Sequence, residues 1–194
     1  MRVTQQDMDM GHRRIVVGAS RLLRERGVRD TSVADAMSEA GMTHGGFYRH
    51  FQTKDDLVIE ALRQAFDEFV QPLEQRQQVE LPQNVAAEYR SLYLSEQHLL
   101  NPGQGCPLPA LGSDIARAKD EIKSEFAAGV RRLIAALALT KDGTAEESAV
   151  AATRELAMLA GAILIARACD RECARAVLEA CSSEGSVRAS TRVP

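Results

Sequence analysis

Hydrogen-bond donors gather in residues 41–51, which read GMTHGGFYRHF. The hydroxyl groups of Thr43 and Tyr48 and the imidazole of His50 can each donate to a phosphate oxygen. Lys54 follows within one helical turn and adds a positive charge beside a helix N-terminus. These residue types at this spacing predict a surface that binds phosphate groups.

Two adjacent glycines, Gly45 and Gly46, lie in the same segment just before Phe47. Glycine inside a helix costs about 1 kcal/mol relative to alanine, so their presence needs a reason. If the segment is helical, Phe47 and Phe51 share the inward face and the glycines lie at the outward N-terminal edge beside His44. A face without side chains lets a phosphate chain approach backbone N–H groups closely. The alternative is a frayed helix start, and spacing alone leaves both interpretations open.

The chain is predicted to be helical almost throughout, with six prolines, 4% aromatic residues and apolar residues spaced by three and four. We expect a first helix over about residues 12–26, ended by Gly27. Ser32 forms a capping box with Asp35 and begins the second helix, which Gly41 ends.

Two further caps follow in short order. Thr43 can cap a short third helix, and Thr53 with Asp56 can cap a fourth. Three capped helices joined by very short turns form a compact bundle, and the tight connection between the second and third is typical of a helix-turn-helix.

Residues 27–62, GVRDTSVADAMSEAGMTHGGFYRHFQTKDDLVIEAL, resemble the N-terminal domain of TetR-family transcriptional repressors. The resemblance runs through this whole stretch with its spacings intact. The positions that carry it are Gly41, Thr43, Gly45, Phe47, Tyr48, His50, Phe51, Thr53, Lys54, Asp55 and Leu57.

This resemblance implies that the third helix is the recognition helix. Thr43, Tyr48, His50 and Lys54 would then hold phosphates, and Arg49 would reach a phosphate or face solvent. Gly46 departs from the family pattern, which often has Thr, Ser or Ala there. The DNA-contacting residues that we expect are Ser32, Thr43, His44, Gly45, Gly46, Tyr48, Arg49, His50 and Lys54.

Composition and charge argue against several other classes of protein. The 194 residues are 45% apolar and 26% charged, as in a soluble globular protein. No run of about 18 apolar residues predicts a membrane span, and no apolar N-terminal segment predicts secretion, so we expect a cytoplasmic protein. The net charge of −3 argues against nucleic-acid binding, and the excess of basic residues in the first 58 is slight. Nothing in the sequence indicates a metal site, a cofactor or an enzyme.

The expected fold is all-α and has two domains. Residues 1–58 would form the three-helix DNA-binding domain, and residues 59–194 a larger helical domain for effector binding and dimerisation. Its tail, about residues 183–194, is expected to be disordered. We expect helices at about 83–100, from near Pro107, and at about 119–138, 144–168 and 171–182.

The resemblance also implies a homodimer on a palindromic double-stranded operator and release by a small-molecule effector. The absence of a clear charged anchor favours an apolar or aromatic effector. Possible pocket residues, each of which could equally be core, are Phe66, Tyr89, Tyr93, Cys106, Phe126, Val130 and Met158. The small and apolar residues expected at the dimer interface are Leu156, Leu159, Ala160, Ile163 and Ala166.

Cys106 offers an alternative trigger. Pro107 places it at a helix N-terminus, where the dipole can make a thiol reactive, so oxidation or alkylation could release DNA; the other interpretation is a small buried residue at a turn. Cys169, Cys173 and Cys181 are expected in core or interface. A helical interaction protein and an enzyme remain the competing classes.

Overall fold

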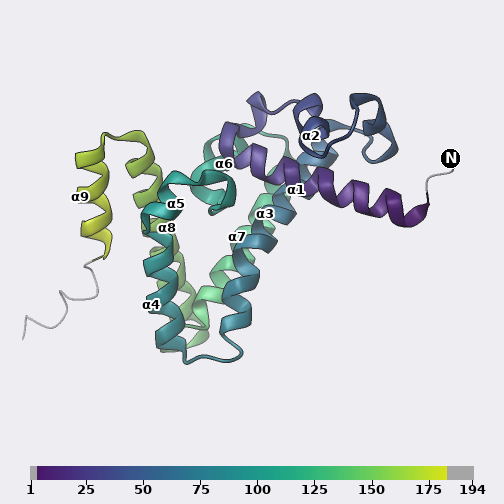
Figure 1. Ribbon diagram of the computed structural model, residues 1–194. Helices are drawn as coiled ribbons and strands as arrows, with labels where there is room; N and C mark the ends of the chain where they lie inside the picture. The colour runs from purple at the N-terminus through teal and green to yellow at the C-terminus, as the bar shows by residue number, and fades with distance from the viewer. Residues whose placement is uncertain (1–3, 183–194) are drawn as a thin grey trace, which may run out of the picture. The chain divides into compact units, whose positions relative to one another are not determined.

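Figure 1 shows the computed structural model, which describes residues 4–182. These residues contain helices and no β-strand, which confirms the all-α prediction. The α-helices are α1 (Gln5–Asp30), α2 (Val33–Glu39), α3 (Lys54–Arg76), α4 (Pro82–Tyr93), α5 (Glu96–Leu100), α6 (Pro107–Ile115), α7 (Asp120–Ala138), α8 (Ala145–Ala168) and α9 (Arg171–Ser182), and the short 3-10 helices are η1 (His44–Arg49) and η2 (Pro102–Gln104). The expected disordered tail lies outside the described residues.

The chain divides into two compact units. The first comprises Met1–Gln71 and Pro102–Leu133, and the second comprises Pro72–Asn101 and Ile134–Pro194. One division falls inside α3, where Pro72 has no N–H to continue the helical hydrogen bonds. A functional boundary between residues 58 and 59 stays a prediction.

Helix α1 is longer than its apolar spacing predicts. It begins at Gln5 rather than near residue 12, because Thr4 and Asp7 form a capping box that the sequence analysis overlooked. Gly27, predicted to end the helix, instead kinks it, with a φ of 86° that favours glycine. One further turn follows before the chain leaves for α2.

In the segment after α1, α2 begins and ends where the sequence predicts. The Ser32–Asp35 capping box begins α2 as predicted, and Gly41 turns the chain with a φ of 69°. Residues 44–49 form a 3-10 helix rather than an α-helix, and the Thr43 side chain makes no capping hydrogen bond.

The first unit has one apolar core that extends beyond the helix-turn-helix segment. Residues of α1, α2, η1 and α3 meet residues of α6 and α7 in it. Its fully or nearly fully buried members include Ile15, Leu23, Met37, Phe47, Phe51, Leu62, Leu111 and Ile122. Helices distant in sequence therefore stabilise the segment that carries the predicted DNA contacts.

The second unit departs from the predicted single helix over residues 83–100. That helix is broken into α4 and α5, because Ser95 caps a new helix by accepting a hydrogen bond from the His98 backbone N–H. Val85 and Tyr93 are buried, whereas Leu92 and Leu100 are exposed.

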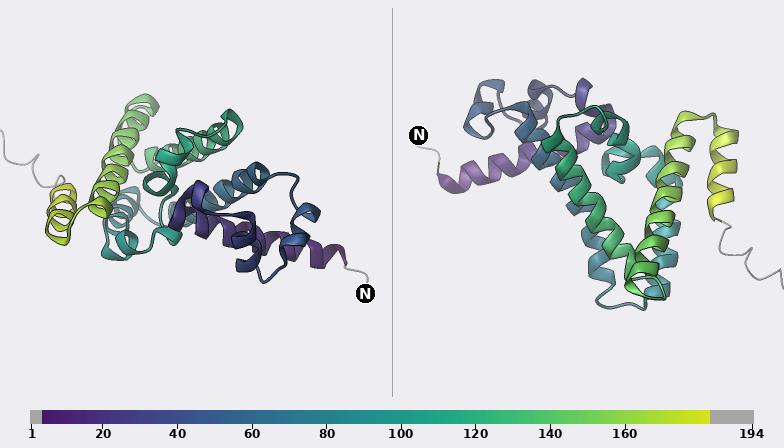
Figure 2. Two further views of the ribbon diagram at one scale, coloured as in Figure 1. Left: turned by 90° about the horizontal axis from the view of Figure 1, so that it is seen from above. Right: turned by 180° about the vertical axis from the view of Figure 1, so that it is seen from behind.

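Helices α8 and α9 lie side by side in the second unit (Figures 1 and 2). Their bounds agree with the predicted ranges within one residue. Among residues 4–182, only α8 is long and apolar enough to cross a membrane by length and composition, which the search for apolar runs missed. A buried core helix passes the same test, so this is weak evidence for a span.

A buried carboxylate organises the second unit. Glu155 on α8 is 8% exposed and accepts hydrogen bonds from Arg90 Nε and Nη2, at 3.0 and 2.6 Å, and from Lys141. Burial raises the pKa of Glu155, but the hydrogen bonds from Lys141 and Arg90 outweigh it and the pKa lies below its usual value. Glu155 is therefore charged and paired with two cations.

Candidate nucleic-acid interface

Helix η1 presents a bare, polar outer face. Thr43, His44, Gly45 and Arg49 are exposed, and Tyr48 is 75% exposed. Tyr48 is too exposed to be a core residue, and it lies beside other hydrogen-bond donors. None of these five residues is covered by a neighbouring helix, so a duplex could reach all of them.

The geometry around Gly45 shows that the fold itself does not require a glycine there. A methyl group built on Gly45 would meet no atom within 4 Å, and its backbone φ is not positive. At Gly46 the nearest atom is the Met37 methyl at 3.4 Å, an ordinary contact. Nothing inside the chain therefore requires glycine at position 45. This favours a role for the glycine in contact with a partner molecule.

Two stacked aromatic rings pack on the buried side of η1. Phe47 and Phe51 are 2% and 4% exposed, and their ring centroids lie 5.4 Å apart. The His12 ring of α1 stacks on Phe51 at 4.7 Å. Burial of these rings fixes η1 against α1 and α2, so the exposed face is held by a rigid base.

His50 differs from the other predicted DNA-contacting residues because its side chain packs near α1. It is half-buried, and its ring lies 5.8 Å from that of His12, whose Nε2 is 2.7 Å from a Glu60 carboxylate oxygen. Burial lowers the pKa of His50, and its neighbours His12 and Arg49 lower it further. A neutral imidazole remains a possible hydrogen-bond donor to phosphate, but one without charge.

Lys54 and Ser32 each have a partner inside the chain. The Lys54 Nζ donates to the Val28 carbonyl oxygen at 2.8 Å, near the end of α1. The Ser32 hydroxyl oxygen accepts from the Asp35 N–H at 3.1 Å. An ammonium has three donors, so Lys54 retains two for a phosphate while it stabilises the end of α1.

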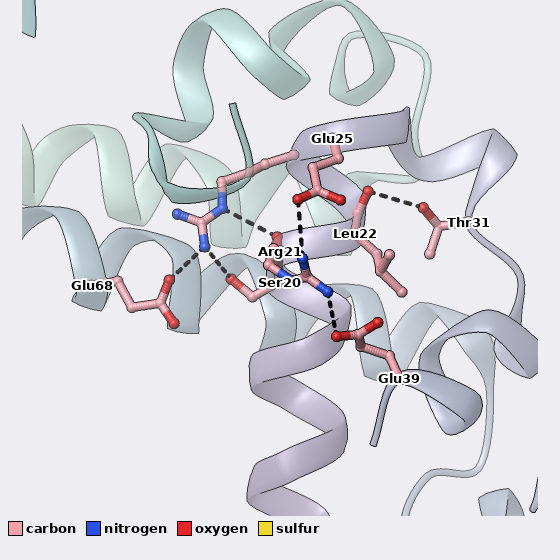
Figure 3. A network of polar contacts seen from close by, with 8 residues as sticks. Ser20, Arg21, Leu22, Glu25, Thr31, Glu39 and Glu68 are labelled. Carbon is pink, nitrogen blue, oxygen red and sulfur yellow. Dashed lines mark hydrogen bonds and ion pairs between the residues drawn. The ribbon is translucent and has the colours of Figure 1, made fainter. Parts of the chain in front are cut away.

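Two residues that the sequence analysis missed hold the last turns of α1. Arg24 is 3% exposed and donates to the Ser20 carbonyl, the Ser20 hydroxyl and the Gly105 carbonyl at 3.1 Å each, and to Glu68. Ser20 and Glu68 are labelled in Figure 3, where dashed lines mark hydrogen bonds and ion pairs. The carboxylate of Asp114 on α6 accepts from the Val28 N–H at 2.8 Å. The only available sequence signal was an arginine on the apolar face of α1, four residues after a serine.

The predicted effector residues fall into both units. Phe66, Phe126 and Val130 belong to the first, and Phe66 packs edge-on to Phe126 with centroids 5.4 Å apart. A methyl group built at Gly129 would lie 2.1 Å from the Phe66 ring, so that ring lies directly on the α7 backbone.

The other predicted pocket residues are Tyr89, Tyr93 and Met158 in the second unit and Cys106 in the first. The Tyr89 and Tyr93 rings are 5.6 Å apart. Cys106 is the N-cap residue of α6 and fully buried, with Pro107 in the first turn as predicted. No group of three potential metal ligands occurs within residues 4–182.

Four of the five residues predicted at the dimer interface have almost no surface in the single chain, and the interface itself stays a prediction. Leu156, Leu159, Ile163 and Ala166 are buried within the chain itself, and Ala160 is half-buried. The opposite face is open to solvent: it carries Val150, Ala157, Leu164, Ile165 and Ala168, all of them exposed. Because α8 is apolar on several sides, its sequence could not distinguish the two faces.

Residues 15–61 match the family described as bacterial regulatory proteins of the tetR family. The matched range contains α2, η1 and the exposed face described above. This chain therefore contains a TetR-family DNA-binding domain. It is a DNA-binding transcriptional regulator with an N-terminal helix-turn-helix domain and a helical C-terminal domain, as the sequence predicted.

Two curated relatives of this TetR-family chain are named as transcriptional regulators. The HTH-type transcriptional repressor KstR2 of Rhodococcus jostii is 42% identical over 50 residues, which are 26% of this chain and only 24% of KstR2. An uncharacterised HTH-type transcriptional regulator of Mycobacterium tuberculosis is 28% identical over 166 residues, 79% of this chain and 82% of the relative.

Solved structures share the fold over most of the chain. Reduced Escherichia coli NemR aligns with a TM-score of 0.75 at 18% identity and covers 89% of this chain and 93% of its own. A Saccharomonospora viridis regulator bound to choline scores 0.67 at 20% identity, covering 89% and 93%. Bacillus subtilis FadR bound to stearoyl-CoA scores 0.66 at 15% identity, covering 89% and 98%.

Proposed function

We propose that this TetR-family regulator is a ligand-responsive repressor that binds a palindromic operator as a homodimer. The observation that carries the proposal is the exposed face of η1, where Tyr48 projects into solvent beside a glycine that the fold does not require. In the proposed complex this face lies in the major groove. Thr43, Tyr48 and Lys54 bind phosphates, and residues 44–46 approach the base edges.

The open face of α8 supports the homodimer. Leu164 and Ile165 are 53% and 50% exposed, and the small residues Ala157 and Gly161 lie on the same side of the helix. Small residues allow two helices to approach closely, and exposed leucine and isoleucine lose contact with water when they do. A twofold dimer places its two recognition helices about 34–36 Å apart, one turn of DNA.

Release by an effector needs an element whose position affects η1. Helix α6 fits this role, because its Asp114 holds Val28 at the end of α1 and the Gly105 carbonyl just before it binds Arg24. An effector that prefers one position of α6 would change the population of DNA-competent dimers in proportion to that preference. The choline and stearoyl-CoA complexes of the structural neighbours support a small-molecule effector in general.

The test is selection of DNA by the full chain from a random duplex library, followed by affinity measurements at several salt concentrations. We expect a palindromic consensus with half-sites about 10 base pairs apart, and log K that falls steeply with log salt. If no sequence is enriched over the starting library, operator binding is wrong. If a single half-site is enriched and the protein binds it as a monomer, only the dimer is wrong.

Thiol sensing at Cys106 stays as the alternative trigger, and its burial counts against it. A reagent in water reaches the sulfur only if the start of α6 opens, because Cys106 has no exposed surface. A Cys106→Ser variant that keeps oxidant-triggered release would eliminate this trigger. Operator binding also implies a cytoplasmic location, which we include in the proposal.

A further inference from the structure

A series of contacts connects α3 to the end of η1 through α1. The Glu60 carboxylate on α3 lies 2.7 Å from His12 Nε2 on α1. The His12 ring stacks on Phe51, with centroids 4.7 Å apart and an interplanar angle of 24°, and lies 5.8 Å from the His50 ring. All four residues belong to the first unit. One carboxylate on α3 therefore holds the ring beside which both Phe51 and His50 pack.

His50, the last residue in this series, is packed on one side and open on another. A methyl group built on Gly11 of α1 would lie 3.5 Å from His50 Cε1, so this edge of the imidazole faces the α1 backbone. The side chain also borders a groove of about 410 Å³ that is lined in addition by Gln52, Asp56 and Arg63. The direction of the imidazole therefore depends on its packing against α1, and its remaining surface is accessible to a partner.

The hydrogen bond between Glu60 and His12 fixes how the His12 ring faces. With the carboxylate oxygen as acceptor, Nε2 is the protonated nitrogen of His12 and donates the bond. A histidine ring whose nitrogen is held in this way has a defined tautomer and orientation. Without the carboxylate, the half-buried His12 ring is free to turn, and His50 loses a fixed neighbour.

We propose that Glu60 is a positioning residue for DNA binding, which acts through His12 to direct the His50 imidazole at a phosphate oxygen. This inference rests on the phosphate contact expected of His50 in the proposed operator complex. The negative charge of Glu60 by itself opposes binding to phosphates. The two effects of Glu60 are therefore opposite in sign, so removal of the carboxylate can distinguish them.

Three variants of the full chain, titrated with the selected duplex, separate positioning from charge. Glu60→Ala removes both the charge and the hydrogen bond, and we expect its affinity to fall about three- to tenfold. Glu60→Gln retains an acceptor oxygen for His12, so it should bind at least as tightly as the wild type. Glu125→Ala is the matched control, because Glu125 pairs with Arg63 of α3 at 2.6 Å, outside the series of contacts. It should also bind at least as tightly as the wild type.

A double-mutant cycle tests whether the effect passes through His50. In a His50→Ala background, Glu60→Ala should change the affinity less than twofold, because the contact that Glu60 supports is already absent. His12→Ala removes the ring between the two residues and should show the same loss and the same dependence on His50. If selection yields no consensus, the cycle is run on a mixed-sequence duplex at low salt, because phosphate contacts do not depend on sequence.

The failures of this inference and of the proposed function differ in the cycle. If His50→Ala binds like the wild type, the phosphate contact of His50 is wrong, and the positioning role is wrong with it. If His50→Ala weakens binding and Glu60→Ala weakens it equally in both backgrounds, only the positioning role is wrong. An affinity of Glu60→Gln as low as that of Glu60→Ala would also overturn the positioning role.

Discussion

The Lys54 Nζ donates a hydrogen bond to the Val28 carbonyl oxygen at 2.8 Å, so the residue expected to bind phosphate also caps the end of α1. The last carbonyls of a helix lack partners within it, and a lysine there also complements the helix dipole. Lys54→Met should lower the free energy of unfolding by about 1 kcal/mol. It should also reduce the slope of log K against log salt by about 0.9, one phosphate contact. Denaturation and DNA titration measure the two effects separately, and an unchanged salt slope would leave Lys54 with the capping role alone.

Gly45→Ala should separate folding from DNA binding. A methyl group at position 45 meets nothing in the chain, so stability should stay equal or rise by about 0.4–1 kcal/mol through a less flexible unfolded state. Affinity for the selected duplex should fall about tenfold or more, a loss of about 1.4 kcal/mol.

Gly41→Ala is the matched control for this prediction. Its φ of 69° disfavours alanine although the space around it is also open, so it should lose about 1 kcal/mol of stability. If Gly45→Ala binds the duplex like the wild type, η1 does not approach DNA closely at this position.

Removing the charge of Glu155 should destabilise the second unit. Glu155→Gln leaves Arg90 and Lys141 without their shared carboxylate in a largely buried site, and we expect a loss of about 1–3 kcal/mol in urea denaturation. Glu146 on the same helix is exposed, so Glu146→Gln should change stability by no more than about 0.5 kcal/mol. Equal losses in the two variants would contradict the assignment of a stabilising buried network.

Stability should fall on mild acidification because two histidines are held neutral. Burial lowers the pKa of His98, and the charge of Arg167 adds to this, although the hydrogen bond to the Tyr93 carbonyl partly opposes it. Burial also lowers the pKa of His50. The unfolded state binds more protons, so stability is complete above about pH 6.5 and declines as pH falls toward the folded-state pKa values. Urea midpoints between pH 7.5 and 5.5 measure this decline. It should be shallower in His98→Asn, and an identical profile would exclude His98 as a contributor.

Charge on the open face of α8 should dissociate the proposed dimer. Leu164→Glu places a carboxylate on a residue that is 53% exposed in the single chain, so the monomer should keep its stability while the dimer dissociates. Sedimentation or light scattering measures the mass. Leu159→Ala, at a fully buried position, should instead lower stability by about 2–5 kcal/mol. A Leu164→Glu protein that remains fully dimeric would move the interface elsewhere.

Local interactions explain the predictions that succeeded. The caps at Ser32 and Thr53 and the turn at Gly41 depend on residues within four positions of one another, so a single sequence is sufficient to predict them. The apolar pair Phe47 and Phe51 was predicted to face inward for the same reason. The approximate bounds of α7, α8 and α9 followed from apolar spacing and from the breaks between them.

The sequence by itself therefore determined where most helices lie and that the N-terminal segment resembles the TetR DNA-binding domain. Only the tertiary structure decided which face of α8 is open, that the His50 ring packs near His12 of α1, that Lys54 caps Val28, and that Cys169 and Cys173 are exposed. These features depend on which distant elements cover a given side. When a helix such as α8 is apolar on several sides, no periodicity in the sequence contains that information.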